Sequence, residues 1–98
     1  MPRLAINILE EELDEAAAFC GQAGVGAEVT AFAWPVNLDD GFMTRVRRHS
    51  LALDGVRVAS CHGPFLELYP ASRDPLIVDV CRKRHRRALL AARELCAT

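Results

Sequence analysis

The sequence predicts an α/β fold built from three consecutive βα units that share a parallel sheet. Three short apolar segments, which begin near residues 4, 27 and 56, have the length of buried strands. Each is followed by a segment in which apolar residues recur at helical spacing. Because a strand, a crossover helix and the next strand form a right-handed unit with parallel strands, the repeat predicts one sheet.

The first unit covers about residues 3–24. Its strand candidate, residues 4–9, is followed directly by acidic residues, which are favourable at the positive end of a helix. Apolar residues then recur from Leu13 to Cys20, and Gly24 provides a stop signal. These features predict a buried strand followed by one amphipathic helix.

The second unit covers about residues 26–54. We expect a strand over residues 26–33 and then a helix. The helix has one apolar face, formed by Phe42, Val46, His49 and Leu53. His49 is therefore interpreted as a packing residue.

The third unit covers about residues 56–97, with a strand over residues 56–61. Asp74 and Pro75 predict the start of the last helix, because Asp caps exposed N–H groups and Pro suits the first helical position. One stripe of this helix is expected to face the core, including His85: Ile77, Cys81, His85, Ala88, Ala92 and Leu95.

Length and composition restrict the class of protein. The 98 residues suffice for one small domain, and 51% hydrophobic with 26% charged residues is typical of a globular chain. No apolar run is long enough for a membrane span and no secretory signal is visible, so we expect a cytoplasmic protein without a membrane partner. The four cysteines have no zinc-finger spacing and are expected to be reduced and mostly buried.

Charge is distributed unevenly along the chain. Residues 1–44 carry one arginine and eight acidic residues, a net charge of −7, whereas residues 45–98 carry eleven basic and five acidic residues, a net charge of +6. We expect the two halves to attract each other.

The predicted topology leaves one face of the sheet bare. Right-handed crossovers without a reversal of direction place all three helices on the same side. A closed (β/α)₈ barrel turns the bare face inward, but it needs about 250 residues. We therefore expect either the N-terminal part of such a barrel or a half-barrel that closes as a homo-oligomer.

Several motifs carry a family resemblance. Residues 61–65 (CHGPF) end the third strand, residues 66–70 (LELYP) follow, residues 72–75 (SRDP) open a helix, and residues 26–29 (GAEV) lie in the second strand candidate. With these motifs and this spacing the chain resembles the xylose-isomerase-like TIM barrels. That family includes sugar phosphate isomerases and epimerases and the related apurinic endonucleases.

The resemblance implies an active site at the carboxyl ends of the strands, acting on sugars, sugar phosphates or sugar-derived ketones with a divalent metal (Mn, Mg, Co or Zn). In the isomerase branch the metal ligands come from later strands, so the 98 residues are expected to be inactive alone and to bind no metal. In the endonuclease branch a histidine that ends the third strand binds zinc, and His62 matches it.

His62 and Glu28 are the candidate catalytic residues. His62 precedes a Gly-Pro turn at the end of a strand, where barrels expose side chains to substrate, and imidazole can bind metal or transfer a proton. Glu28 is a carboxylate within an apolar strand, so a substrate or an arginine must satisfy it. For each residue the alternative is a structural role: a loop hydrogen bond for His62 and an ion pair for Glu28.

Four further residues are candidates for substrate binding. Trp34, Phe65 and Tyr69 border the expected site and either line a pocket over a sugar or belong to the core. Asn7, on the first strand, is either a ligand to substrate or an internal hydrogen-bonding residue.

The basic run over residues 82–87 supports a different function. A non-catalytic module would bind an acidic partner or nucleic acid through this helix. Cations spread around an exposed helical face are, however, ordinary solvation, and no aromatic residues alternate with them to stack bases. The sequence therefore favours a small sugar ligand over nucleic acid.

Overall fold

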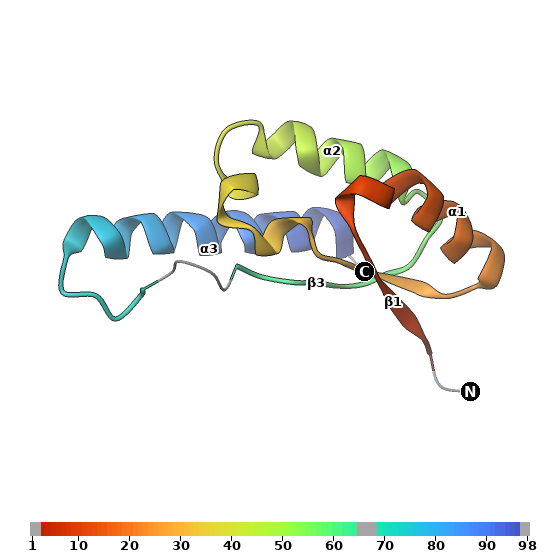
Figure 1. Cartoon of the computed structure of the whole chain (residues 1–98), viewed down its shortest axis with the longest axis horizontal. Helices are drawn as coiled ribbons and strands as arrows, with labels where there is room; N and C mark the ends of the chain where they lie inside the picture. Colours follow the sequence, from red (N-terminus) through yellow and green to blue (C-terminus); the bar gives the residue numbers. More distant parts are fainter. Residues whose placement is uncertain (1–2, 65–68, 97–98) are drawn as a thin grey trace.

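The computed structural model of the chain describes residues 3–64 and 69–96. Strands and α-helices alternate within them (Figure 1): β1 (Ala5–Ile8), α1 (Leu13–Ala23), β2 (Gly26–Val29), α2 (Phe42–Ala52), β3 (Val58–Cys61) and α3 (Pro75–Cys96). Short 3-10 helices, η1 (Glu10–Glu12), η2 (Ala31–Ala33) and η3 (Pro35–Leu38), occupy the connections. The strands pair in parallel in the order β1-β2-β3, which confirms the predicted α/β class and parallel sheet.

The two faces of the sheet differ in chemistry. Ile8, Ala27 and Val29 are buried in one hydrophobic cluster that includes residues of α1, α2 and α3. All three helices therefore pack on this face, as Figure 1 shows. The opposite face, called the open face below, carries the alternate residues Asn7, Glu28 and Ser60.

The centre of the core lies between the sheet and α2. Phe32 is fully buried and meets the Phe42 ring edge to face at 5.8 Å between centroids. The His49 ring lies 5.5 Å from Phe32 and is 1% exposed, so the predicted packing role of His49 is confirmed. The whole predicted face of α2 is buried: Phe42, Val46, His49 and Leu53.

The second strand is shorter than predicted. It ends at Val29, and the segment expected to continue it, Ala31–Ala33, forms η2. The Thr30 hydroxyl donates to the Ile8 carbonyl at 2.7 Å, and the Ala33 amide donates to the Thr30 carbonyl at 3.0 Å. The backbone therefore turns out of the sheet, although the apolar run continues.

The predicted ends of two helices are confirmed. Gly24 ends α1 in the left-handed conformation, φ +68°, which glycine adopts without steric cost. The Asp74 carboxylate accepts a hydrogen bond from the Leu76 amide at 2.9 Å, as a residue that caps the start of α3 should.

The buried stripe of α3 differs from the predicted one. Cys81 and Ala88 are buried as expected, and Ala91 is buried where Ala92 was expected. His85 is exposed, so the packing role expected for it is wrong. Ile77 is 40% exposed because the first turns of α3 extend beyond α2 (Figure 1). Helical spacing alone does not show where a long helix leaves the body of the molecule.

The expected attraction between the two halves of the chain is visible as defined contacts. Arg84 of α3 forms an ion pair with Asp39 at 3.0 Å, and its hydrogen bond lowers the pKa of that carboxyl. Arg87 donates to the Leu38 carbonyl at 2.6 Å and lies over the Phe42 ring. Two cations of the basic run therefore hold α3 against the loop before α2.

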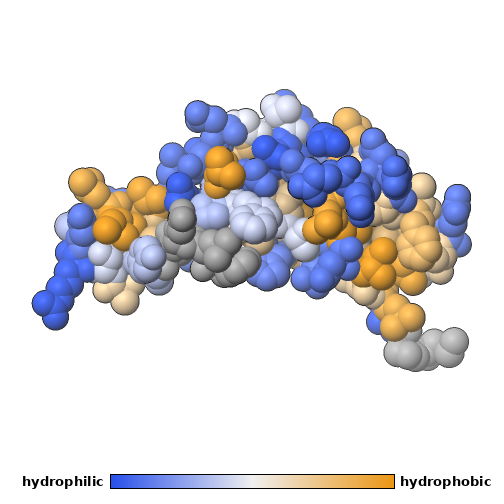
Figure 2. All heavy atoms as spheres, viewed as in Figure 1, coloured by the Kyte–Doolittle hydropathy of each residue, from blue (hydrophilic) through white to orange (hydrophobic). Residues whose placement is uncertain are grey.

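The surface is mostly polar over α2, and apolar side chains gather at the two ends of the molecule (Figure 2). One of these groups lies on the projecting start of α3, where Leu76 is 75% and Val80 43% exposed. Within residues 3–64 and 69–96, no helix has the length and apolar character that a membrane crossing requires.

Phe32→Leu should lower the free energy of unfolding by about 1–2 kcal/mol, because the smaller side chain loses aromatic contacts in the centre of the core. Urea denaturation measures this. Phe19→Leu is the matched control, since Phe19 is 53% exposed and should be nearly neutral. Equal losses in both variants would contradict the described core.

Candidate functional site

A pocket of about 330 Å³ lies at the carboxyl ends of β1 and β2. In parallel sheets this edge is where ligands bind, because the connections that leave the strands converge there. The connections after both strands and the side of α2 contribute the lining: Leu9, Glu10, Glu11, Thr30, Ala31, Trp34, Val36, Asn37 and Arg45.

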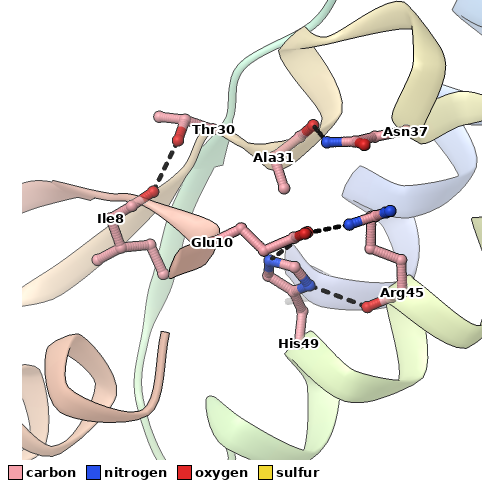
Figure 3. Close-up of polar contacts among 7 residues, drawn as sticks. All are labelled: Ile8, Glu10, Thr30, Ala31, Asn37, Arg45 and His49. Carbon is pink, nitrogen blue, oxygen red and sulfur yellow. Dashed lines mark hydrogen bonds and ion pairs between the residues drawn. The ribbon is translucent and has the colours of Figure 1, made fainter. Parts of the chain in front are cut away.

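Glu10 and Arg45 form the polar centre of this pocket (Figure 3). A guanidinium nitrogen of Arg45 donates to Glu10 Oε1, and both side chains are largely buried, with 27% and 21% exposed for Arg45 and Glu10. Glu10 Oε2 and Arg45 Nε are buried without a hydrogen-bond partner in the described part of the chain. The pair therefore retains hydrogen-bonding capacity inside the protein.

His49 completes the cluster from one turn further along α2. Its Nδ1 donates to the Arg45 carbonyl at 2.9 Å, since a carbonyl oxygen can only accept. The other ring nitrogen, Nε2, then faces Glu10 Oε2 at 4.0 Å. Burial lowers the pKa of His49 below its usual value, so the ring is neutral near pH 7.

Two side-chain hydrogen bonds fix the connections that surround the pocket (Figure 3). Thr30 ties the end of β2 to the carbonyl of Ile8 at the end of β1. Asn37 Nδ2 donates to the Ala31 carbonyl at 2.7 Å, which leaves the Asn37 amide oxygen available as an acceptor. These two hydrogen bonds therefore hold the backbone around the pocket in place.

The open face places two predicted site residues side by side. Asn7 pairs in register with Glu28, and Glu28 pairs with Ser60. Glu28 is half-buried and forms no ion pair with an arginine within residues 3–64 and 69–96, so the structural partner considered for it is not seen there. The three side chains form a polar row across the sheet.

His62 lies just beyond β3, as predicted. Its amide donates to the Val29 carbonyl at 2.8 Å, which extends the β2–β3 pairing by one bond. Its Nδ1 donates to the Gly63 carbonyl at 2.7 Å, so in the neutral ring Nε2 carries the lone pair. His62 follows Ser60 by two positions and therefore continues the polar row toward the carboxyl edge.

The aromatic candidates do not share one pocket. Trp34 lines the pocket beside Glu10 and is 53% exposed. Tyr69 is 64% exposed and borders a separate hollow at the start of α3, with Leu76 and Val80. Phe65 lies outside the described residues. Of the two described aromatic candidates, only Trp34 lines the pocket at the carboxyl edge.

Two pocket residues were not predicted from sequence, Glu10 and Arg45, and neither was the contact of buried His49 with Glu10. Glu10 is one of several consecutive acidic residues, and Arg45 lies on the polar face of its helix. The available signal was position, since Glu10 directly follows an apolar strand whose carboxyl end is expected to carry functional side chains. Nothing in the sequence pairs it with a residue 35 positions away.

The residues present do not fit the divalent metal that the resemblance implies. Such a site needs several oxygen or nitrogen donors around one point. In the described residues no group of three or more His, Cys, Asp or Glu side chains could hold a metal ion.

Glu10→Gln should destabilise the protein by about 1–2 kcal/mol, because the amide loses the charge-assisted bond from Arg45. Glu11→Gln, which changes an exposed neighbour in the same way, should have little effect. Thermal and urea unfolding of the two variants test this, and similar stabilities would contradict the buried ion pair.

His49 should make the protein less stable as the pH falls below about 6.5, the usual histidine pKa. The folded state binds this proton more weakly than the unfolded state, so stability is lost as the pH decreases toward the lowered pKa. Urea denaturation at about pH 7.5 and pH 5 measures the effect. His49→Gln should reduce the difference, whereas the same change at exposed His85 should preserve it.

Comparison with protein-family models, with curated proteins and with solved structures found no match to this chain. The resemblance to the xylose-isomerase-like barrels thus depends on the motifs quoted from the sequence.

Proposed function

We propose that the chain binds a sugar or sugar-derived ketone at the carboxyl edge of its sheet, as part of a barrel of the sugar isomerase and epimerase type. The observation that carries this proposal is the position of Trp34. Its half-exposed indole lies in one pocket with Glu10, Asn37 and Arg45, at the edge where parallel sheets bind ligands.

The lining suits a polyhydroxylated ligand. A sugar presents C–H groups that pack on an aromatic face, and hydroxyls that both donate and accept hydrogen bonds. Glu11 and the amide oxygen of Asn37 can accept, and the Arg45 guanidinium can donate. A purely apolar ligand would leave these groups without partners, which costs binding free energy.

The polar row supplies the groups for chemistry on such a ligand. Glu28 and His62 can each hold or move a proton next to a carbonyl, the reaction that the family resemblance implies. A divalent metal, where one is bound in the family, polarises that carbonyl. We expect the 98-residue chain to bind sugar without turning it over, because in the resemblance the metal ligands lie on later strands.

Intrinsic fluorescence tests the binding step, since Trp34 is the single tryptophan in the sequence. Titration of the full chain with D-xylulose, D-fructose or an inosose, with Mg²⁺ present, should change the emission in a saturable way. Glu11→Gln and Asn37→Ala, which remove acceptors from the pocket lining, should weaken binding at least fivefold, whereas His85→Ala should not. No saturable change with any of the three sugars would overturn the proposal.

Proton exchange in D₂O tests the expected lack of turnover. Each sugar is incubated with the chain and either Mg²⁺ or Mn²⁺, and deuterium incorporation beside the carbonyl is followed by NMR. No incorporation above the protein-free rate is expected. Exchange that His62→Ala abolishes would show instead that these three units are catalytic without further strands.

A second candidate function, binding of an acidic partner, is supported by the outer side of α3. Arg84 and Arg87 are engaged within the fold, but Arg82, Lys83 and Arg86 are exposed. A row of exposed cations attracts polyanions through charge alone.

Salt dependence distinguishes this candidate from sugar binding. Affinity for heparin, used as a polyanion probe, should fall steeply between low and physiological salt if α3 is the interface. Replacing Arg82, Lys83 and Arg86 by glutamine should abolish it without changing the response of Trp34 to sugar. Binding that survives the triple replacement would exclude this surface.

A further inference from the structure

Two of the four cysteines are in direct contact. Cys61, the last residue of β3, and Cys96, the last residue of α3, have their Sγ atoms 3.4 Å apart. Both side chains are half-buried. All four cysteines lie in the described part of the chain, and none of them is in a disulfide. The expectation that the cysteines are mostly buried is therefore met only by Cys20 and Cys81.

The other two thiols have different surroundings. Cys20 is 1% exposed and donates to the Gly26 carbonyl at 3.7 Å, while Cys81 is 2% exposed and accepts from the Tyr69 amide at 3.2 Å. Each is held inside the fold by a backbone partner. Only Cys61 and Cys96 combine a thiol neighbour with partial access to solvent.

The Sγ atoms of Cys61 and Cys96 are near enough for a disulfide to form after a small movement. A disulfide needs the two sulfur atoms about 2 Å apart, so Cys61 Sγ and Cys96 Sγ must approach by roughly 1.4 Å. Cys96 ends its helix, and the last turn of a helix yields more readily than its middle because its carbonyls lack intrahelical partners. The required movement can therefore come from the end of α3 without disturbing the sheet.

We propose that Cys61 and Cys96 form a reversible disulfide by exchange with a low-molecular-weight disulfide such as oxidised glutathione. The Cys96 thiolate attacks one glutathione sulfur, and the first glutathione leaves as a thiolate. Cys61 then loses its proton and attacks the Cys96 sulfur, which releases the second glutathione. Two protein thiols are oxidised, and one glutathione disulfide is reduced to two thiols.

The position of Cys96 assigns the order of attack. Cys96 is the last residue of α3, where the backbone yields most readily, so it is the residue that meets the oxidant, and Cys61 is the resolving thiol. Burial raises the pKa of Cys61, which agrees with this order. Closure should accelerate as the pH is raised, because Cys61 must lose its proton in the second step.

The disulfide would fasten the end of α3 to the end of β3. The two cysteines are 35 positions apart, and closing a loop of this length restricts the unfolded chain. The oxidised protein should therefore melt at a higher temperature. Cys61 directly precedes His62, so the disulfide would form next to a candidate catalytic residue. The redox reaction itself does not rest on the proposed sugar binding.

The experiment exposes the full chain to glutathione buffers of increasing oxidised fraction, blocks remaining thiols with N-ethylmaleimide and maps the peptides by mass spectrometry. The expected product is a peptide pair joined through Cys61 and Cys96, with Cys20 and Cys81 alkylated after unfolding. The melting temperature should rise by several degrees on oxidation and return after dithiothreitol.

Single replacements provide the controls. Cys61→Ser should stop the reaction at a mixed disulfide of glutathione on Cys96, and Cys96→Ser should leave Cys61 unmodified. The Cys81→Ala variant should still form the Cys61–Cys96 disulfide. If that variant does not fold, the peptide map of the unaltered chain shows which cysteines are joined. A link through Cys20 or Cys81, or stable glutathione on Cys96 in the unaltered chain, would overturn the proposal.

Discussion

The structure depends on a sheet that is covered from one side. Because all three helices pack against Ile8, Ala27 and Val29, one face of the sheet provides the hydrophobic core and the other carries polar residues. The parallel order β1-β2-β3 also directs all three carboxyl ends to one edge. The pocket beside Trp34 and the polar row with Glu28 are both consequences of this arrangement.

Two ion pairs hold connecting segments of the chain against the helices. Glu10 and Arg45 join the start of the first helical segment to α2, and Asp39 and Arg84 join the loop before α2 to α3. Each pair joins a residue of the acidic half of the chain to a residue of the basic half. The uneven charge distribution therefore contributes to the packing of these segments. Such half-buried pairs specify geometry more than they contribute stability, since desolvation offsets much of the attraction.

The sequence predicted what depends on local spacing. The class of fold, the start of α3 at Asp74 and the end of α1 at Gly24 all follow from short patterns with a physical cause. The end of β2 could not be predicted, because a hydrogen bond from Thr30 to the neighbouring strand turns the chain out of the sheet. Likewise, the exposure of His85 depends on how α3 is rotated against the body, which spacing only approximates.

For the candidate site, the structure places one predicted residue, Trp34, in the pocket at the carboxyl edge. Trp34, Glu28 and His62 could be chosen as candidates from the sequence because each lies in or next to a predicted strand. The Glu10–Arg45 pair could not be, since 35 residues separate its members and both belong to charged segments that resemble ordinary surface. Contacts between distant charged residues are set by the packing of helices, which no local pattern records.

The polar row also limits what can cover the open face. A second copy of the chain that closed the sheet by apolar packing would bury Glu28 and its symmetry mate together, and two carboxylates without cations are costly to desolvate. A cover that supplies hydrogen-bond donors avoids this cost, whether it is a hydroxylated ligand or further strands with basic side chains. The chemistry of the polar row therefore disfavours a dry, apolar interface between identical subunits on the open face.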